Sequence, residues 1–160
     1  MGSAYRRRPA LFLRPAWPDE GPLLSRLAMN SKARWGYDEE FMARCEAELT
    51  VTPWRIASER FRVAQAGERI AGFSAVAMRD AKALVQDLFI DPEFVRLGVG
   101  HLLLRDLLDH ARRHGVRLVH VEADPNAASF YEHEGFRRTG EVPSASIAGR
   151  NLPLMEMRFS

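Results

Sequence analysis

The chain has 160 residues, 46% of them hydrophobic, which is enough for one globular domain with a full core and too little for two ordinary ones. Its formal net charge is only +2, a balance that fits an anionic small ligand as well as nucleic acid and therefore selects neither. The single cysteine, Cys45, excludes an internal disulfide, and no apolar run reaches the length of a membrane-spanning helix.

Residues 1–9 are basic but are not followed by the apolar core of a signal peptide, so we expect a solvated, disordered tail. Three arginines in this tail would bind nucleic acid only weakly, which makes nucleic acid the disfavoured partner. Residues 10–160 are predicted to form a single domain. With one cysteine and no membrane span, the sequence indicates a reducing cytoplasm.

Strand and helix signals alternate in the first half of the chain. Residues 18–20 resemble the first turn of a helix that continues to Leu27. Asp38 is the expected N-cap of a second helix, Glu39–Leu49, and we expect Pro53 to end this helical region. Apolar runs predict strands over residues 10–16, 61–64 and 70–78.

The second half continues with strands and helices in alternation. The predicted strands are 83–90, 116–123, 136–141 and 152–159, and the predicted helices are 100–114 and 126–135. An early antiparallel meander followed by strand–helix–strand indicates an α/β fold. We expect a mixed, mostly antiparallel central sheet with helices on both faces. A ligand crevice is expected beyond the carboxyl ends of its parallel strands.

Two glycines, Gly98 and Gly100, stand where the strand 83–90 has ended and a helix begins. The first amides of a helix bind phosphate well, and glycine lets a phosphate approach the backbone closely. A dinucleotide fingerprint would need a third glycine at position 103, where Leu103 stands, and the Gly-Lys-Ser/Thr of a P-loop is absent. The alternative is that both glycines only shape the loop.

Two linked motifs make the phosphate interpretation more specific. The stretch "LFIDPEFVRLGVGHLLLRDLLDHA" and the downstream "DPNAASFYEHEGF" resemble the two signatures of the GCN5-related N-acetyltransferase (GNAT) family, in the same order. The resemblance covers roughly residues 10–160, and its specific part is 87–136. Val95 departs from the glutamine or arginine that is usual there. The resemblance implies a GNAT fold with an acetyl-CoA crevice at a splayed parallel strand pair.

The resemblance implies acetyl-CoA as co-substrate, and it implies no metal. Loop amides would hold the pyrophosphate, strand backbone would pair with the pantetheine arm, and three residues would contact the cofactor from the facing side. These residues are Val95, Arg96, Leu97, Gly98, Val99, Gly100 and His101 in the loop, Leu88, Phe89 and Ile90 in the strand, and Asn126, Phe130 and Tyr131 opposite.

Acetyl transfer to an amine requires a proton donor for the departing thiolate and an acceptor for the amine's proton. Tyr131 matches the family's general acid, and the alternative is a tyrosine that only fills the core. Asp87 and Glu122 lie on neighbouring strands as candidate bases, and the sequence does not choose between them. The amide of Ile90 is expected to stabilise the developing oxyanion.

The loop between the first two helices usually walls the acceptor site in this fold. Trp35 and Tyr37 are its aromatic residues, and Arg150 in a later loop is a candidate partner for an acceptor carboxylate. Trp35 could equally anchor the loop to the core. The leading interpretation is acetylation of a small-molecule amine, in a monomer or a homodimer. Protein or peptide N-terminal acetylation and a CoA-binding sensor without turnover remain as alternatives.

Overall fold

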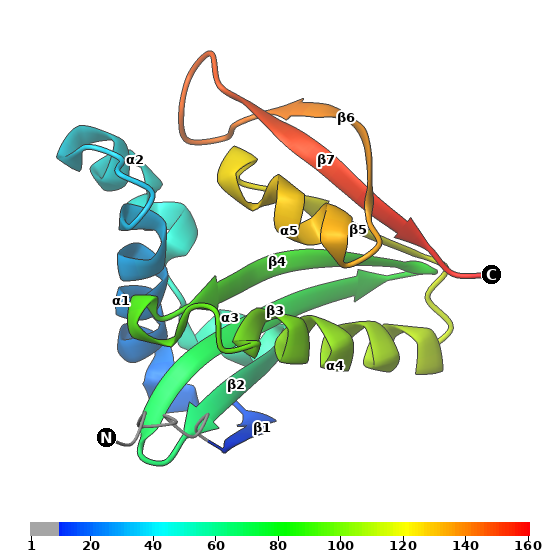
Figure 1. The fold of residues 1–160 in the computed structure, drawn as a ribbon, viewed down its shortest axis with the longest axis horizontal. Helices are drawn as coiled ribbons and strands as arrows, with labels where there is room; N and C mark the ends of the chain where they lie inside the picture. The colour runs from blue at the N-terminus through cyan, green and yellow to red at the C-terminus, as the bar shows by residue number, and fades with distance from the viewer. Residues whose placement is uncertain (1–9) are drawn as a thin grey trace, which may run out of the picture.

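The computed structural model describes residues 10–160 (Figure 1). The tail predicted for residues 1–9 lies outside the described part of the chain. The strands are β1 (Leu11–Pro15), β2 (Arg60–Ala66), β3 (Arg69–Arg79), β4 (Lys82–Ile90), β5 (Leu118–Glu122), β6 (Arg137–Pro143) and β7 (Asn151–Arg158). The helices are α1 (Gly21–Ala33), α2 (Glu39–Leu49), α3 (Pro53–Ser58), α4 (Val99–Arg113) and α5 (Ala128–His133), with short 3-10 turns η1 (Pro18–Glu20), η2 (Pro92–Phe94) and η3 (Pro125–Ala127).

The strands form one sheet in the order β1-β2-β3-β4-β5-β7-β6. Neighbouring strands are antiparallel except β4 and β5, which are parallel. This parallel pair is in register only from Lys82 opposite Leu118 to Leu84 opposite His120. Beyond that point β4 continues to Ile90 without pairing to β5, and in Figure 1 β7 and β6 turn away from β4.

Helices cover both faces of the sheet, as the sequence predicts. On one face α1 and α2 contribute Leu24 and Cys45 to a core with Phe73 of β3. On the other face α4 and α5 contribute Leu104 and Tyr131 to a second core with strands β3, β4 and β5. The predicted mixed, mostly antiparallel α/β architecture is therefore confirmed.

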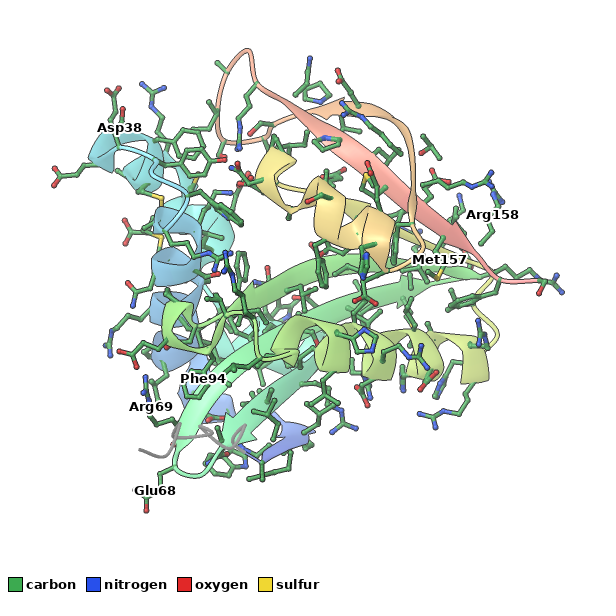
Figure 2. All side chains as sticks on the ribbon, viewed as in Figure 1. Asp38, Glu68, Arg69, Phe94, Met157 and Arg158 are labelled. Carbon is green, nitrogen blue, oxygen red and sulfur yellow. The ribbon has the colours of Figure 1, made fainter. Side chains whose placement is uncertain are left out.

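Side-chain caps account for the starts of α2 and α3. Asp38, labelled at the start of α2 in Figure 2, accepts a hydrogen bond of 2.8 Å from the backbone N–H of Phe41, the N-cap role predicted for it. Pro53 does not end the helical region, and that prediction is wrong. Thr52 caps a further helix, α3, and Pro53 is its first residue, where proline costs no hydrogen bond.

A β-bulge at Gln86 changes which face the side chains of β4 occupy. Asp87 pairs with Ala75 of β3, but Val85 pairs with the next residue, Val76, so Gln86 is an extra residue. Before the bulge, Val85 faces α4, whereas after it Leu88 and Ile90 take that face. Asp87 consequently points to the opposite face, toward α3. Bulges often redirect a side chain beside an active site in this way.

No helix among residues 10–160 is both long and apolar enough to cross a membrane.

Gly72 marks a close approach of β3 to β4 and α4. A Cβ at this position would lie 2.7 Å from the carbonyl oxygen of Phe89 and 3.1 Å from Cγ1 of Val99. Because the nearest atom belongs to the backbone, Gly72→Ala should lower the free energy of unfolding by about 1–3 kcal/mol, measured by urea denaturation. Gly140→Ala is the matched control, since a Cβ there meets nothing within 4 Å. Equal midpoints for the two variants would contradict this account.

Candidate active site

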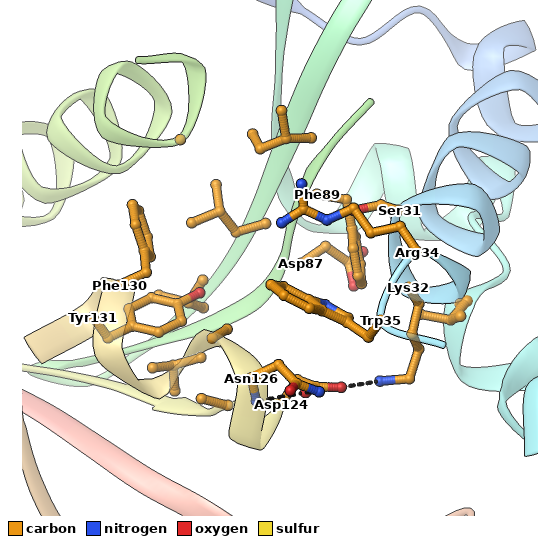
Figure 3. A pocket seen from close by; sticks show the side chains of 18 of the residues that line it. Ser31, Lys32, Arg34, Trp35, Asp87, Phe89, Asp124, Asn126, Phe130 and Tyr131 are labelled. Carbon is orange, nitrogen blue, oxygen red and sulfur yellow. Dashed lines mark hydrogen bonds and ion pairs between the residues drawn. The ribbon is translucent and has the colours of Figure 1, made fainter. Parts of the chain in front are cut away.

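A cavity of about 500 Å³ lies where β4 and β5 diverge. Its walls come from the second half of β4, the start of α4, the β5–α5 segment, the end of α1, α2 and the β6–β7 loop. In Figure 3, Arg34 and Trp35 enter from the α1 side, and Phe130 and Tyr131 enter from the opposite side. The segments that the sequence predicts to bind the cofactor, to carry the proton donor and to bind the acceptor therefore line one cavity.

The first turn of α4 faces this cavity and has no side-chain cap. Its first amides have no acceptor within the helix and lie at the positive end of the helix dipole. Gly98 is the N-cap, with a φ of 80° in the left-handed region that favours glycine, and a Cβ there would meet no protein atom within 4 Å. Free amides beside open space fit a phosphate-bearing ligand such as coenzyme A.

Gly100 has a packing role that the loop pattern does not reveal. A Cβ on Gly100 would lie 3.3 Å from Cζ of Phe130, tighter than ordinary van der Waals contact. The missing side chain therefore lets α5 pack against the first turn of α4. Phe130 in turn contacts Tyr131 edge to face, with ring centroids 5.2 Å apart.

The structure brings most of the predicted cofactor residues to the cavity. Those that line it are Leu88, Phe89, Ile90, Val95, Arg96, Gly98, Val99, Gly100, His101, Asn126, Phe130 and Tyr131. Leu97 is not among the lining residues, and its partly buried side chain packs against the core cluster that contains Phe94 and Leu103. The side chain of Asn126 does not cap α5, whose N-cap is Ala127. It donates to the hydroxyl of Tyr37 and to Asp124.

Tyr131 is 4% exposed, and in Figure 3 its hydroxyl points into the cavity. Burial raises the pKa of Tyr131 well above its usual range, and the negative charge of Asp87 raises it further. The hydroxyl is therefore protonated at any physiological pH. A protonated phenol that faces a cavity can act as a proton donor.

Asp87 is 6% exposed and is held by α3. Nη2 of Arg55 donates to its Oδ2 at 2.7 Å, and Nε of Arg55 donates to Glu59 at 2.6 Å. Burial raises the pKa of Asp87 to about 6, because one guanidinium shared with a second carboxylate offsets the loss of water only in part. A carboxylate with this pKa is suited to accept a proton near neutral pH.

Glu122, the other candidate base, is the last residue of β5 and also lines the cavity. It is exposed, whereas Asp87 is buried, so the two carboxylates differ in environment. Both carboxylates line the cavity, so their positions do not distinguish which of them is the base.

The acceptor residues predicted from sequence divide into two groups. Trp35 is 41% exposed and lines the cavity, with the Arg34 guanidinium 4.4 Å from its ring centroid. Tyr37 is not among the lining residues, since its hydroxyl is turned to Asp124 at 2.9 Å. Arg150 lines the cavity, but its Nη2 already donates to the Tyr37 hydroxyl at 2.6 Å.

Four charged residues at the site were not predicted from the sequence: Lys32, Arg34, Arg55 and Asp124. Asp124 precedes Pro125 and Asn126, a pattern typical of a side chain that caps the next turn, and it does accept from the Asn126 amide at 2.8 Å. Its contacts with residues about ninety positions away have no local signal. Among residues 10–160, no group of three or more His, Cys, Asp or Glu side chains could hold a metal ion.

Comparison with known proteins agrees with this geometry. A family profile described as "Acetyltransferase (GNAT) domain" matches residues 31–159. The chain is 30% identical over 119 residues to the N-alpha-acetyltransferase RimI of Mycobacterium tuberculosis, covering 64% of this chain and 75% of that protein. It is 29% identical over 72 residues to an uncharacterized N-acetyltransferase, ycf52, of Pyropia yezoensis. The latter match spans only 41% of that relative's length.

The fold is also found in solved structures. The PaiA N-acetyltransferase of Thermoplasma acidophilum, solved in complex with coenzyme A, superposes with a TM-score of 0.79 at 18% identity. The superposition covers 94% of this chain and 99% of that one. Because the GNAT domain profile matches most of its length, this chain belongs to the GNAT acetyltransferase family, and its fold is that of the solved relative.

Proposed function

We propose that this chain is a cytoplasmic, acetyl-CoA-dependent N-acetyltransferase that acts on the primary amine of a small molecule. One observation carries the proposal: a single cavity reaches from the uncapped start of α4, past the Tyr131 hydroxyl, to Trp35. A cofactor phosphate, a proton donor and an acceptor can therefore meet in one space. The relatives named above support the same reaction class.

Acetyl-CoA, when bound, supplies an activated thioester. The free amides at the start of α4 hold its pyrophosphate, and Leu88 to Ile90 offer backbone to its pantetheine arm. The Tyr131 hydroxyl is the proton donor for the departing sulfur, since its raised pKa keeps it protonated. Asp87 takes the proton of the amine, because its pKa of about 6 leaves it largely ionised at neutral pH. Glu122 is the alternative base.

Acetylation of a protein N-terminus is the second candidate function, and the similarity to RimI favours it. The two functions differ in the size of the acceptor. Thiol release from acetyl-CoA, assayed with a panel of small amines and with short peptides bearing free N-termini, separates them. Thiol release with peptides alone would show that the acceptor is a protein N-terminus and not a small molecule. Thiol release with neither kind of acceptor would favour a CoA-binding sensor.

Acetyl-CoA affinity should depend on Gly98. Gly98→Ala puts a methyl group in the open space before α4, so the dissociation constant from calorimetry should rise about tenfold, or 1.4 kcal/mol. Gly115→Ala is the matched control at the other end of the same helix. Its φ is 78° and a Cβ there also meets nothing within 4 Å, so backbone strain of about 1–2 kcal/mol is common to both variants. Equal acetyl-CoA affinities in the two variants would rule out a phosphate site at the start of α4.

Tyr131→Phe should lower kcat and leave acetyl-CoA affinity close to that of the wild type. A positioned acid contributes about 10²–10⁴-fold in rate, whereas the phenyl ring keeps the edge-to-face contacts with Phe130 and Phe136. Steady-state kinetics and calorimetry on the same preparation measure the two effects. A kcat equal to that of the wild type would reduce Tyr131 to a core residue.

The acidic limb of the pH profile identifies the base. If Asp87 accepts the proton, kcat/KM should fall below about pH 6, where its carboxylate becomes protonated. Arg55→Met removes the cation that lowers the pKa of Asp87, so the limb should move to higher pH. Arg55→Lys keeps the charge and is the control, for which the limb should stay near that of the wild type.

A limb that stays in place in Arg55→Met but is lost in Glu122→Gln would assign the base to Glu122. In that case the ion pair of Arg55 with Asp87 would serve only to hold α3 against β4.

A further inference from the structure

One carboxylate, Asp124, gathers side chains from four separate parts of the chain at the acceptor end of the cavity. Three groups donate to its Oδ2: Nζ of Lys32 at 2.9 Å, the hydroxyl of Tyr37 at 2.9 Å and Nη2 of Arg150 at 3.4 Å. Asn126 donates to its Oδ1 through its backbone N–H at 2.8 Å and its side chain at 3.0 Å. We call these five residues the Asp124 latch.

The latch remains ionised and hydrogen-bonded across the physiological pH range. Burial alone would raise the pKa of Asp124, but the Lys32 hydrogen bond, the Asn126 amide and the Tyr37 hydroxyl together lower it to about 2. Burial and Asp124 raise the pKa of Tyr37 to about 12, so its hydroxyl keeps the proton that it donates. The Tyr37 oxygen also accepts from Arg150 and Asn126, at 2.6 and 2.9 Å.

Two members of the latch flank the segment that walls the cavity. Lys32 is in the last turn of α1, and Tyr37 lies just before α2, where its ring stacks on Phe41 with centroids 4.0 Å apart. The segment 33–36 between them is exposed and carries Arg34 and Trp35. Fixing Lys32 and Tyr37 on one carboxylate therefore fixes both ends of this short segment.

Arg34 differs from the other cations at this end of the cavity. Lys32 and Arg150 share Asp124, whereas Arg34 has no ion-pair partner among residues 10–160. Its guanidinium stacks on Trp35, and Figure 3 shows both side chains projecting into the cavity beside Asp87 and Phe89. Glu48 also lines this end, where it accepts a hydrogen bond of 3.0 Å from Ser146. The free guanidinium is thus available to an anionic group on a ligand.

We propose that Asp124 is a positioning residue that presents Arg34 and Trp35 to the acceptor, and that the acceptor is an amine carrying a carboxylate, which Arg34 binds. This inference rests on the proposed function and deepens it by naming the acceptor class and the residue that selects it. Arg150, the candidate carboxylate partner from sequence, serves instead to hold the latch.

The first test needs no acceptor. Trp35 becomes the sole tryptophan in a Trp17→Phe, Trp54→Phe background, because the chain has three tryptophans and these two are exposed, at 55% and 75%. Asp124→Asn in this background should increase acrylamide quenching of Trp35 fluorescence, since the segment 33–36 loses its anchors. Arg34→Met should lower quenching by iodide relative to acrylamide, because the anionic quencher loses its cation.

The second test uses amino acids paired with their decarboxylated amines: leucine with 3-methylbutylamine and phenylalanine with phenethylamine. Thiol release should favour the amino acid of each pair. Arg34→Met should raise the KM of the amino acid about ten- to a hundredfold, the loss of a charge-assisted hydrogen bond, and leave the KM of the amine unchanged. Asp124→Asn should raise the amino-acid KM similarly.

Glu20→Gln is the matched control for a general loss of stability. The Arg14–Glu20 pair has a distance of 2.7 Å and side-chain exposures of 12% and 7%, against 2.9 Å, 13% and 14% for Lys32–Asp124. Glu20 does not line the cavity. Its substitution should lower the melting temperature but leave Trp35 quenching and both KM values as in the wild type.

Unchanged Trp35 quenching in Asp124→Asn, or the same change in Glu20→Gln, would overturn the positioning role. Equal use of amino acids and their decarboxylated amines, with no change in Arg34→Met, would overturn the acceptor class. If neither member of either pair is acetylated, the acceptor class named here is wrong. Failure of the proposed function is a different result, in which no amine or peptide of the wider panel releases thiol from acetyl-CoA. Even then, the quenching experiment still tests whether Asp124 positions the segment 33–36.

Discussion

The divergence of β4 from β5 is the constraint on which the rest of this site depends. The two parallel strands share a ladder only as far as Leu84 and His120. Past that point, backbone groups of β4 are free of β5, and the space between the strands becomes a cavity rather than a core. Tyr131 and Asp87 lie on opposite faces of the sheet beside this opening, where burial raises the pKa of Tyr131 and the negative charge of Asp87 raises it further.

Two aspartates at this opening have opposite electrostatic environments. Asp87 is buried and has one guanidinium that it shares with Glu59, so its pKa rises to about 6. Asp124 receives donors from Lys32, Tyr37, Asn126 and Arg150, and its pKa falls to about 2. Asp87 is the more deeply buried of the two and has fewer donors, and both differences separate the two pKa values. The first group can exchange a proton near neutral pH, and the second is a permanent anion that holds other groups in place.

The packing around the cavity ties its two ends together. Gly100 admits Phe130, and Phe130 contacts Tyr131, so α5 is fixed against the start of α4. At the other end, the Asp124 latch fixes the end of α1 and the β6–β7 loop to the segment that precedes α5. The helix that carries Tyr131 is therefore packed against the start of α4, and the segment just before it is tied to α1 and the β6–β7 loop.

The sequence by itself determined the family, the mixed sheet and many of the residues that line the cavity, because these depend on local signals: strand periodicity, helix caps and two compact motifs. It misjudged Pro53, where a cap at Thr52 and the favourable first helical position reverse the usual meaning of proline. Only the tertiary structure decided that Gln86 forms a bulge that turns Asp87 toward Arg55. It also decided that Lys32, Tyr37 and Arg150 meet at Asp124, since such contacts join residues far apart in sequence and arise only when the sheet closes.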